Sequence, residues 1–258
     1  MSVAPNKVKV IVITGASSGI GRALAELYAK SGVVLCLTGQ NEQRLKEISD
    51  ICSAKGARVI SGLIDVTDAK AMEEWLLDID DKHAVDIIIA NAGISAGTNG
   101  NTSEDPEQVK RVFGVNLYGV LNTISPLQNR MIERQSGSIV IMSSLAGYRG
   151  WPGAPAYCGS KAAVKIYGES LRNVLSKSNV YVNVVCPGFV KSRMTDANEF
   201  KMPFLMDTDK AARIIAKGIE NNKGRIAFPA MTTFIAWFFM VLPDFMSHYL
   251  LSNSPSKS

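Results

Sequence analysis

The sequence predicts an α/β fold built on a doubly wound parallel sheet. Three observations carry this prediction. The chain begins with a β-branched run, a glycine-rich turn and a helical pattern; strand and helix patterns then alternate along most of its length; and glycines or polar residues follow the ends of several strands. Such alternation is typical of a Rossmann-type sheet, with about seven strands here and helices on both faces.

Length and composition favour one folded unit. With 258 residues, 47% hydrophobic and 20% charged, we expect a single domain over residues 1–258, with polar termini that carry no function. The net charge is +5, but Lys and Arg are scattered among acids, so we expect no nucleic-acid partner. The positive excess is compatible with an anionic ligand, an anionic membrane surface or a plain solvated surface.

Cysteine and histidine usage indicates a reducing compartment without a metal site. The chain has four cysteines without CxxC spacing and two histidines without a ligand-spaced cluster. No charged-then-apolar leader precedes the first strand. We therefore expect a cytoplasmic protein with no catalytic metal.

The first strand is expected over Lys7–Thr14, and it leads into the sequence GASSGIG and a helical pattern. Gly15, Gly19 and Gly21 allow a sharp turn and a close approach to a pyrophosphate, while the first helical amides, from about Ser18, offer unpaired donors. A flexible Gly-Ser loop is the alternative. The strand-to-helix context favours nucleotide binding.

Further strands and helices follow in alternation. We expect strands at Val33–Thr38, Ala57–Leu63, Val85–Ala90, Ser138–Met142 and Val180–Cys186, and helices at Glu42–Lys55, Ala69–Ile79, Glu107–Glu133, through Tyr157 to about Leu175, and Thr208–Asn221. Asn116 lies within the 107–133 helix between two glycines, which suggests a kink or a polar network.

The residues after the second strand bear on the form of the cofactor. An acid there is typical of NAD enzymes and an Arg of NADP enzymes, but this chain has Gly39 and Gln40. The cofactor is NADP or NAD, and the missing acid tilts the prediction slightly toward NADP. Arg44 and Lys46 are nearby cations that can assist, although we interpret both as exposed helix residues.

Tyr157 and Lys161 are the central candidates for chemistry. Four residues apart on a helix, they lie on one face. A neighbouring ammonium favours the phenolate and lowers the pKa of a tyrosine toward neutrality, so Tyr157 can pass a proton. The spacing alone occurs by chance, but Ser143 and Ser144, the glycine turn and Asn116 all belong to the same sheet edge or its helices.

These residues resemble the motifs of the short-chain dehydrogenases/reductases from about Val8 to Phe228. The resemblance rests on TGASSGIG, Asp65, Asn91–Gly93, Asn116, the pair Ser143 and Ser144, YCGSK at Tyr157–Lys161 and PGFVKS at Pro187–Ser192, in the order of that family. It departs at Gly39 and Gln40, and at Ser192, where the family commonly has Thr.

The resemblance implies a catalytic set. Tyr157 would act as general acid and base, Lys161 would lower its pKa and hold the nicotinamide ribose, Ser144 would bind the substrate oxygen, and Asn116 would complete a proton relay. It also implies a cofactor site, with Asp65 binding the adenine amino group. The cofactor residues are Gly15, Ser17, Ser18, Gly19, Ile20, Gly21, Gln40, Asp65, Val66, Asn91, Ala92, Gly93, Tyr157, Lys161, Pro187, Gly188, Val190 and Ser192.

The implied function is an NAD(P)-dependent oxidoreductase that interconverts a carbonyl and a secondary alcohol by hydride transfer. The partner is then a small-molecule carbonyl or alcohol, and the substrate can be hydrophobic or lipid-like. The alternative is a non-catalytic NAD(P)-binding sensor or scaffold of the same fold. The complete set of Asn116, Ser144, Tyr157 and Lys161 favours the enzyme. We expect a homodimer or homotetramer.

The C-terminal third leaves the shared pattern. We expect a substrate lid at Met194–Met206 and a helix after it, together residues 194–221, and then a hydrophobic extension over residues 229–251. The run Ile226–Leu242 is too interrupted to span a membrane. Three interpretations stay open: a core strand followed by a helix packed on the domain or on a partner subunit, a peripheral anchor on the cytoplasmic membrane face, and a wall for a lipid-like substrate.

Overall fold

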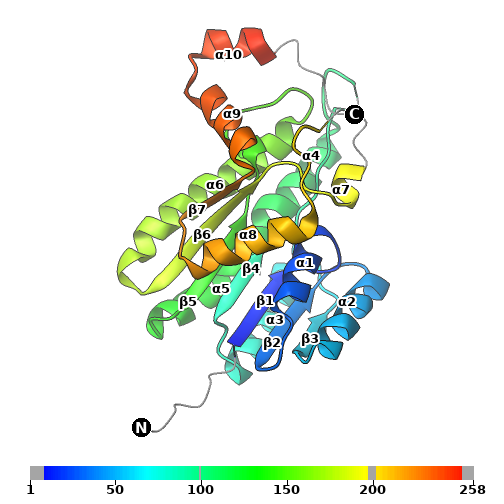
Figure 1. Cartoon of the computed structure of the whole chain (residues 1–258), viewed down its shortest axis with the longest axis vertical. Helices are drawn as coiled ribbons and strands as arrows, with labels where there is room; N and C mark the ends of the chain where they lie inside the picture. The colour runs from blue at the N-terminus through cyan, green and yellow to red at the C-terminus, as the bar shows by residue number, and fades with distance from the viewer. Residues whose placement is uncertain (1–8, 99, 197–201, 252–258) are drawn as a thin grey trace.

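The computed structural model describes residues 9–98, 100–196 and 202–251, and within them the chain forms one parallel sheet flanked by helices (Figure 1). The beginning of the first predicted strand, residues 7 and 8, and the middle of the predicted lid, residues 197–201, lie outside the described part. The strands are β1 (Lys9–Thr14), β2 (Val33–Thr38), β3 (Arg58–Gly62), β4 (Ile87–Ala90), β5 (Gly137–Met142), β6 (Val180–Pro187) and β7 (Arg225–Phe228).

The sheet is doubly wound about β1. Its strand order is β3-β2-β1-β4-β5-β6-β7 and every pairing is parallel. Thr14 at the end of β1 pairs with Thr38 at the end of β2, so the turns after these strands lie at one edge. The order reverses between β1 and β4, the place where open α/β sheets bind ligands. The predicted fold class is confirmed.

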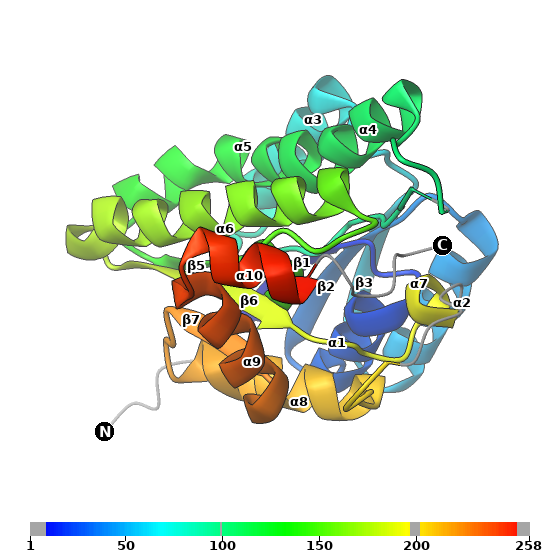
Figure 2. The same cartoon turned by 90° about the horizontal axis from the view of Figure 1, so that it is seen from above.

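Two layers of helices cover the sheet, and Figure 2 shows them on opposite faces. Helices α1, α2 and α8 pack on one face, and α3, α5 and α6 pack on the other. The helices are α1 (Gly19–Tyr28), α2 (Glu42–Ala54), α3 (Ala69–Lys82), α4 (Pro106–Phe113), α5 (Gly119–Glu133), α6 (Pro155–Val174), α7 (Arg193–Asp196), α8 (Thr208–Glu220), α9 (Ala230–Val241) and α10 (Asp244–Leu251).

The long helix expected over 107–133 is interrupted at Asn116. Helix α4 ends at Phe113, a π-helical turn spans Gly114–Tyr118, and α5 begins at Gly119. The extra residue of a π-turn changes which side chains face inward, and such turns are frequent at functional sites. Here it brings Asn116 into a fully buried position.

The apolar C-terminal run forms a strand and then two helices. Ile226 lies in β7, which pairs with β6, and α9 and α10 follow. Ala236 of α9 is buried, but Phe234 is 59% exposed, so α9 packs on the domain along one side only. Within the described residues no helix combines the length and apolar character that crossing a bilayer requires.

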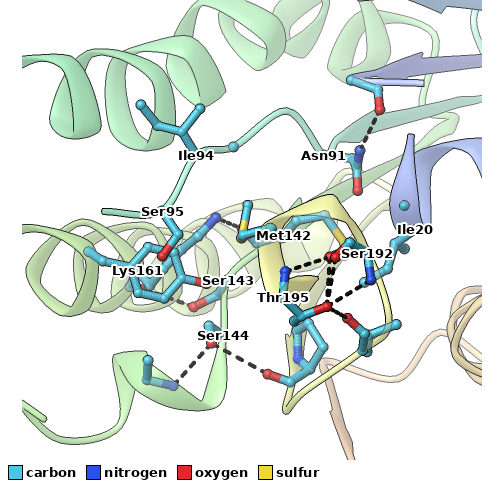
Figure 3. Close-up of a pocket in the computed structure, with 18 of the residues that line it drawn as sticks. Ile20, Asn91, Ile94, Ser95, Met142, Ser143, Ser144, Lys161, Ser192 and Thr195 are labelled. Atoms are coloured by element: carbon cyan, nitrogen blue, oxygen red, sulfur yellow. Dashed lines mark hydrogen bonds between the residues drawn. The ribbon is translucent and has the colours of Figure 1, made fainter. Parts of the chain in front are cut away.

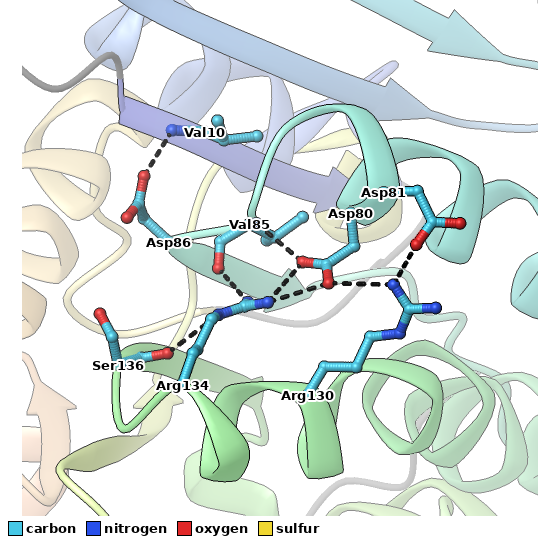
Figure 4. Close-up of polar contacts among 8 residues, drawn as sticks. All are labelled: Val10, Asp80, Asp81, Val85, Asp86, Arg130, Arg134 and Ser136. Carbon is cyan, nitrogen blue, oxygen red and sulfur yellow. Dashed lines mark hydrogen bonds and ion pairs between the residues drawn. The ribbon is translucent and has the colours of Figure 1, made fainter.

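A buried ion pair joins α3 to α5 at the opposite end of the sheet from the turns (Figure 4). The Asp80 side chain is 4% exposed and accepts hydrogen bonds from Arg134 at 2.8 and 2.9 Å and from the Val85 backbone N–H at 2.9 Å. Arg134 also donates to the Val85 carbonyl at 2.6 Å. Arg130 bridges Asp80 and the exposed Asp81. The network fixes the start of β4 against α5.

Replacing Asp80 by alanine is expected to lower the free energy of unfolding by about 3–5 kcal/mol, because the variant leaves the Arg134 guanidinium partly buried without its carboxylate. The control is Asp81→Ala, which removes a 63% exposed side chain from the same network and is expected to cost less than about 1 kcal/mol. Urea unfolding followed by circular dichroism measures both. Equal losses for the two variants would contradict the buried pair.

Candidate active site

A cavity of about 890 Å³ lies at the carboxyl edge of the sheet. It is lined by residues that follow β1, β2, β4, β5 and β6, and by residues of α6, α7 and α9. Figure 3 shows Ser144 and Lys161 on one side of it and Ile20 and Ser192 on the other. The predicted residues that line the cavity are Gly15, Ser17, Ser18, Gly19, Ile20, Gln40, Val66, Asn91, Ala92, Gly93, Ser144, Tyr157, Lys161, Pro187, Gly188, Val190 and Ser192.

Gly21, Asp65 and Asn116 do not line the cavity. Gly21 lies behind the glycine turn, where an added Cβ would stand 2.5 Å from the Gly15 carbonyl oxygen. Asp65 is exposed, and its carboxylate accepts from the backbone N–H and the hydroxyl of Thr67 at 2.9 and 2.8 Å. The neighbouring Ile64 and Val66 reach the cavity instead.

The glycine turn is held by the turn that follows β4. The Asn91 amide donates to the carbonyls of Thr14 at 2.9 Å and Gly15 at 3.3 Å, and the Thr14 hydroxyl accepts from the backbone N–H groups of Asn91 and Ala92 at 3.1 Å each. Gly15 has a φ of +65°, and a Cβ there would lie 2.9 Å from the Ala92 Cα. Only glycine fits this position without strain or a clash.

The N-terminus of α1 is free to take an anion. Its N-cap residue, Ser18, makes no side-chain capping bond, and the first turn holds no acid. By contrast, α2, α3 and α4 are capped by the side chains of Asn41, Asp68 and Asp105. Because α1 points its open backbone N–H groups at the cavity, its end fits the pyrophosphate of a dinucleotide.

The predicted exposure of Arg44 is wrong. Lys46 is exposed and pairs with Asp50 at 2.7 Å, as expected of a surface residue. Arg44 instead lines the cavity beside Gly39 and Gln40, and its buried Nε atom has no hydrogen-bond partner among the described residues. The Asn41 cap starts α2 so that Arg44, in the first turn, faces the end of β2. This placement depends on helix phase, which composition did not indicate.

The two serines after β5 have different surroundings. Ser143 is buried, and its hydroxyl donates to the Lys161 carbonyl at 2.7 Å. The Ser144 oxygen accepts from the Ala146 N–H at 3.1 Å and shares a side-chain hydrogen bond with Tyr157. Of the two serines, Ser144 is therefore the one that is hydrogen-bonded to the Tyr157 side chain.

Lys161 is buried one helical turn after Tyr157 on α6. The pKa of the Lys161 ammonium is lowered to about 8 because burial disfavours the charged form. Its Nζ donates to the Met142 carbonyl at 2.9 Å and lies 6.0 Å from the centroid of the Tyr157 ring. Burial raises the pKa of Tyr157, while the Ser144 hydrogen bond acts in the opposite direction. Burial is the largest influence on this phenol, and with a raised pKa Tyr157 holds its proton at neutral pH. The lowering of the Tyr157 pKa by Lys161 stays a prediction.

Asn116 does not line the cavity itself but is hydrogen-bonded to Ile94, which does. Its side-chain oxygen accepts from the Ile94 N–H at 2.8 Å, and its side-chain nitrogen donates to the Ile94 carbonyl at 2.9 Å and to the Ser160 hydroxyl at 3.0 Å. The amide thus joins the segment after β4 to the residue before Lys161. A polar network forms at the predicted position.

Part of the remaining cavity wall is apolar. It is formed by Ile94, Leu145, Trp151, Phe189, Met194 and Ile235. Met194 comes from the predicted substrate lid. Ile235 comes from the C-terminal extension, for which a wall of the substrate site was one of three open interpretations. Trp151 lies in a Gly- and Pro-rich loop without periodicity, so no sequence signal assigned it to the site.

Comparison with known proteins identifies the family. Residues 9–202 match the family model described as short chain dehydrogenase. An oxidoreductase of Myxococcus xanthus is 37% identical over 237 residues, which cover 92% of this chain and 93% of the relative. The chain belongs to the short-chain dehydrogenase family, and as such it is an NAD(P)-dependent dehydrogenase or reductase.

Two solved structures show the same fold. A short chain dehydrogenase from Mycobacterium paratuberculosis bound to NAD has a TM-score of 0.78 and 24% identity, covering 90% of this chain and 100% of that chain. A short-chain dehydrogenase from Sphingobium yanoikuyae in complex with NADPH has a TM-score of 0.77 and 23% identity, covering 96% of both chains.

Proposed function

We propose that the protein interconverts a carbonyl compound and a secondary alcohol with NADP or NAD, with Tyr157 as general acid and base. The observation that carries the proposal is the meeting of Tyr157, Ser144 and Lys161 in one cavity with the uncapped end of α1. When bound, the nicotinamide supplies or accepts the hydride. The protein supplies orientation and the proton.

Each side chain has a defined part in the proposed reaction. Ser144 donates a hydrogen bond to the substrate oxygen, and Tyr157, protonated at neutral pH, gives that oxygen its proton during reduction. The Lys161 ammonium stabilises the phenolate left behind. The amide of Asn116 donates to the Ser160 hydroxyl, which donates in turn to the Tyr157 backbone carbonyl, so Asn116 holds the helix turn that carries Tyr157 and Lys161. In the proposed reaction Asn116 completes a relay to Lys161 through water.

The substrate is proposed to be hydrophobic. The cavity wall beyond the reacting groups presents Trp151, Phe189 and Met194, and no carboxylate lines the cavity in the described residues. An apolar wall favours a substrate with an extended hydrocarbon part, because burial of that part contributes binding energy.

A panel of aldehydes, ketones and secondary alcohols, from short to long-chain and sterol-like, tests the proposal. Each compound is incubated with the protein and with NADPH, NADH or their oxidised forms, and the absorbance of the reduced nicotinamide is followed. We expect turnover with apolar ketones or alcohols. Turnover with none of the compounds, despite measurable binding of the cofactor, would favour the alternative of a sensor or scaffold.

Arg44 supports a proposed preference for NADP. A guanidinium beside the end of β2, with a buried nitrogen that lacks a partner in the described structure, suits a phosphate on the adenosine ribose. Gln40, which is exposed, adds no negative charge that would repel it.

Replacing Arg44 by glutamine is expected to raise the KM for NADPH about tenfold, because one charge-assisted hydrogen bond to phosphate is lost, and to change the KM for NADH little. Lys46→Gln is the matched control, since it removes a cation from the same helix outside the cavity. Initial rates at varied cofactor concentration give both constants. An equal rise for both cofactors would show that Arg44 does not contact the phosphate.

A further inference from the structure

Helices α9 and α10 carry a large exposed apolar surface. We call it the apolar platform and define it by Phe234, Trp237, Phe238 and Val241 of α9 and Phe245 and Tyr249 of α10. Phe245 is 74% exposed and Tyr249 is 73% exposed. Both helices lie at one end of the molecule, beyond the strands (Figure 1). Monomeric soluble proteins rarely expose contiguous apolar surface of this kind, and its presence marks a site of interaction.

The exposed arc of α9 contains no charged side chain. Between Ala230 and Val241 the helix has no charged residue, and its two threonines are only partly exposed. An interface with another protein normally has a polar rim around its apolar centre. A helix without charge on its exposed arc, with a Trp and two Phe side chains there, is better matched by the boundary between lipid headgroups and acyl chains.

The lengths of the two helices fix how they can meet a bilayer. Helix α9 has 12 residues and α10 has 8, so α9 is about 18 Å long and neither crosses a hydrocarbon core of about 30 Å. They can lie only in the interface. Arg149 holds α10 to the domain by pairing with Asp244 and donating to the Ser247 hydroxyl, which keeps Phe245 and Tyr249 on the outer side.

The platform is continuous with the cavity. Ile235 of α9 lines the cavity and is also 38% exposed, so it forms part of the mouth. Trp151 in the cavity wall packs edge-on against Phe239 of α9, with ring centroids 5.4 Å apart. Arg193 of α7 is exposed and also lines the cavity, and its positive charge suits an anionic headgroup.

We propose that the apolar platform binds the surface of a lipid bilayer, and that the cavity receives from the bilayer a carbonyl compound with a long hydrocarbon part. This inference rests on the proposed oxidoreductase function and names the source of its substrate. A second copy of the chain on the platform would cover the mouth at Ile235, whereas a bilayer leaves an apolar path into it.

Vesicle sedimentation with the full chain tests the surface. Wild-type protein is expected to sediment with vesicles of phosphatidylcholine and, more strongly, with vesicles that also contain phosphatidylglycerol. Phe234→Glu/Phe245→Glu is expected to bind roughly a hundredfold more weakly, because two buried aromatic contacts are replaced by charges. Ile166→Glu/Val174→Glu is the matched control: it places the same charges on side chains of α6 that are 57% and 69% exposed, and should bind like wild type.

A second measurement connects the surface to the substrate. The substrate for this measurement is a long-chain ketone embedded in the vesicles. In Phe234→Glu/Phe245→Glu the rate of NADPH oxidation is expected to fall in proportion to the loss of vesicle binding. In Ile166→Glu/Val174→Glu the rate is expected to equal that of wild type. Thermal midpoints near that of wild type show that both variants are folded.

Failure of the surface and failure of the function are distinguishable. If wild type reduces a water-soluble ketone but stays in the supernatant with both kinds of vesicle, the membrane proposal falls alone. If sedimentation velocity shows that Phe234→Glu/Phe245→Glu dissociates a dimer that does not bind vesicles, the platform is an interface between copies. If wild type binds vesicles but reduces no carbonyl compound, the proposed carbonyl reduction and the proposed substrate source both fall, while binding to the bilayer stands.

Discussion

Replacing Tyr157 by phenylalanine is expected to lower kcat for carbonyl reduction by about 10²- to 10⁴-fold, the usual contribution of a general acid. The substitution keeps the ring and removes only the hydroxyl that shares a hydrogen bond with Ser144. The glycine turn and the end of α1, which bind the other end of the cofactor in the proposed arrangement, are untouched. Cofactor affinity, measured by fluorescence of the reduced nicotinamide, should therefore change little.

The matched control for this substitution is Tyr148→Phe. Tyr148 is also buried near the site, but it lies outside the cavity, and its pKa is raised to about 12, first by burial and then by Cys186. Loss of its hydroxyl should leave most of the activity. A Tyr157→Phe variant with near wild-type turnover, or a Tyr148→Phe variant as inactive as Tyr157→Phe, would show that the proton comes from elsewhere.

The part of the site that the sequence predicted is the part that local chain geometry requires. Gly15 is needed because the turn takes a positive φ against Ala92, and a strand followed by such a turn and a helix can be recognised from residue order alone. Parallel strands bring their carboxyl ends to one edge, so the turns after β1, β4, β5 and β6 had to meet. Asn116 was found because an asparagine is unfavourable inside a helix.

The part that was not predicted depends on packing between distant segments. Arg44 faces the cavity because the Asn41 cap sets the phase of α2, and a phase error of one residue would turn it to solvent. Trp151 reaches the cavity from a loop and meets Phe239 across a separation of 88 residues. The apolar stretch after β7 was recognised, but its division between a cavity wall and an exposed surface depends on how α9 lies against the domain.

The pKa of Tyr157 is another property that depends on packing and that the sequence alone did not predict. Spacing indicated that Lys161 is near, which is true, but the sign of the shift depends on how much water the fold removes from the phenol. In the proposed reaction a protonated Tyr157 acts as the acid for carbonyl reduction. The reverse reaction needs a base, and raising the pH increases the fraction of phenolate.

The pH dependence of kcat/KM for reduction is expected to follow the ionisation of the Lys161 ammonium. Burial lowers the pKa of its ammonium to about 8, so the charged form is present below that pH and is lost as the pH rises through it. Because Tyr157 has a raised pKa and keeps its proton over this range, kcat/KM for reduction should fall with a single ionisation near pH 8. Rates measured from pH 6 to 9 in buffers of constant ionic strength give the profile.

Lys161→Met removes the ammonium and keeps an unbranched side chain in the buried position. We expect kcat/KM about 10²-fold below wild type at pH 7, the typical loss for one group that stabilises developing negative charge, and a flat profile between pH 6 and 9. Lys165→Met is the control, since Lys165 is equally buried one turn along α6 but lies outside the cavity and pairs with Glu169 at 3.5 Å. Its profile should keep the fall near pH 8. If that fall persists in Lys161→Met, the ionising group is not Lys161, and the stabilisation of the Tyr157 phenolate must be assigned to another residue.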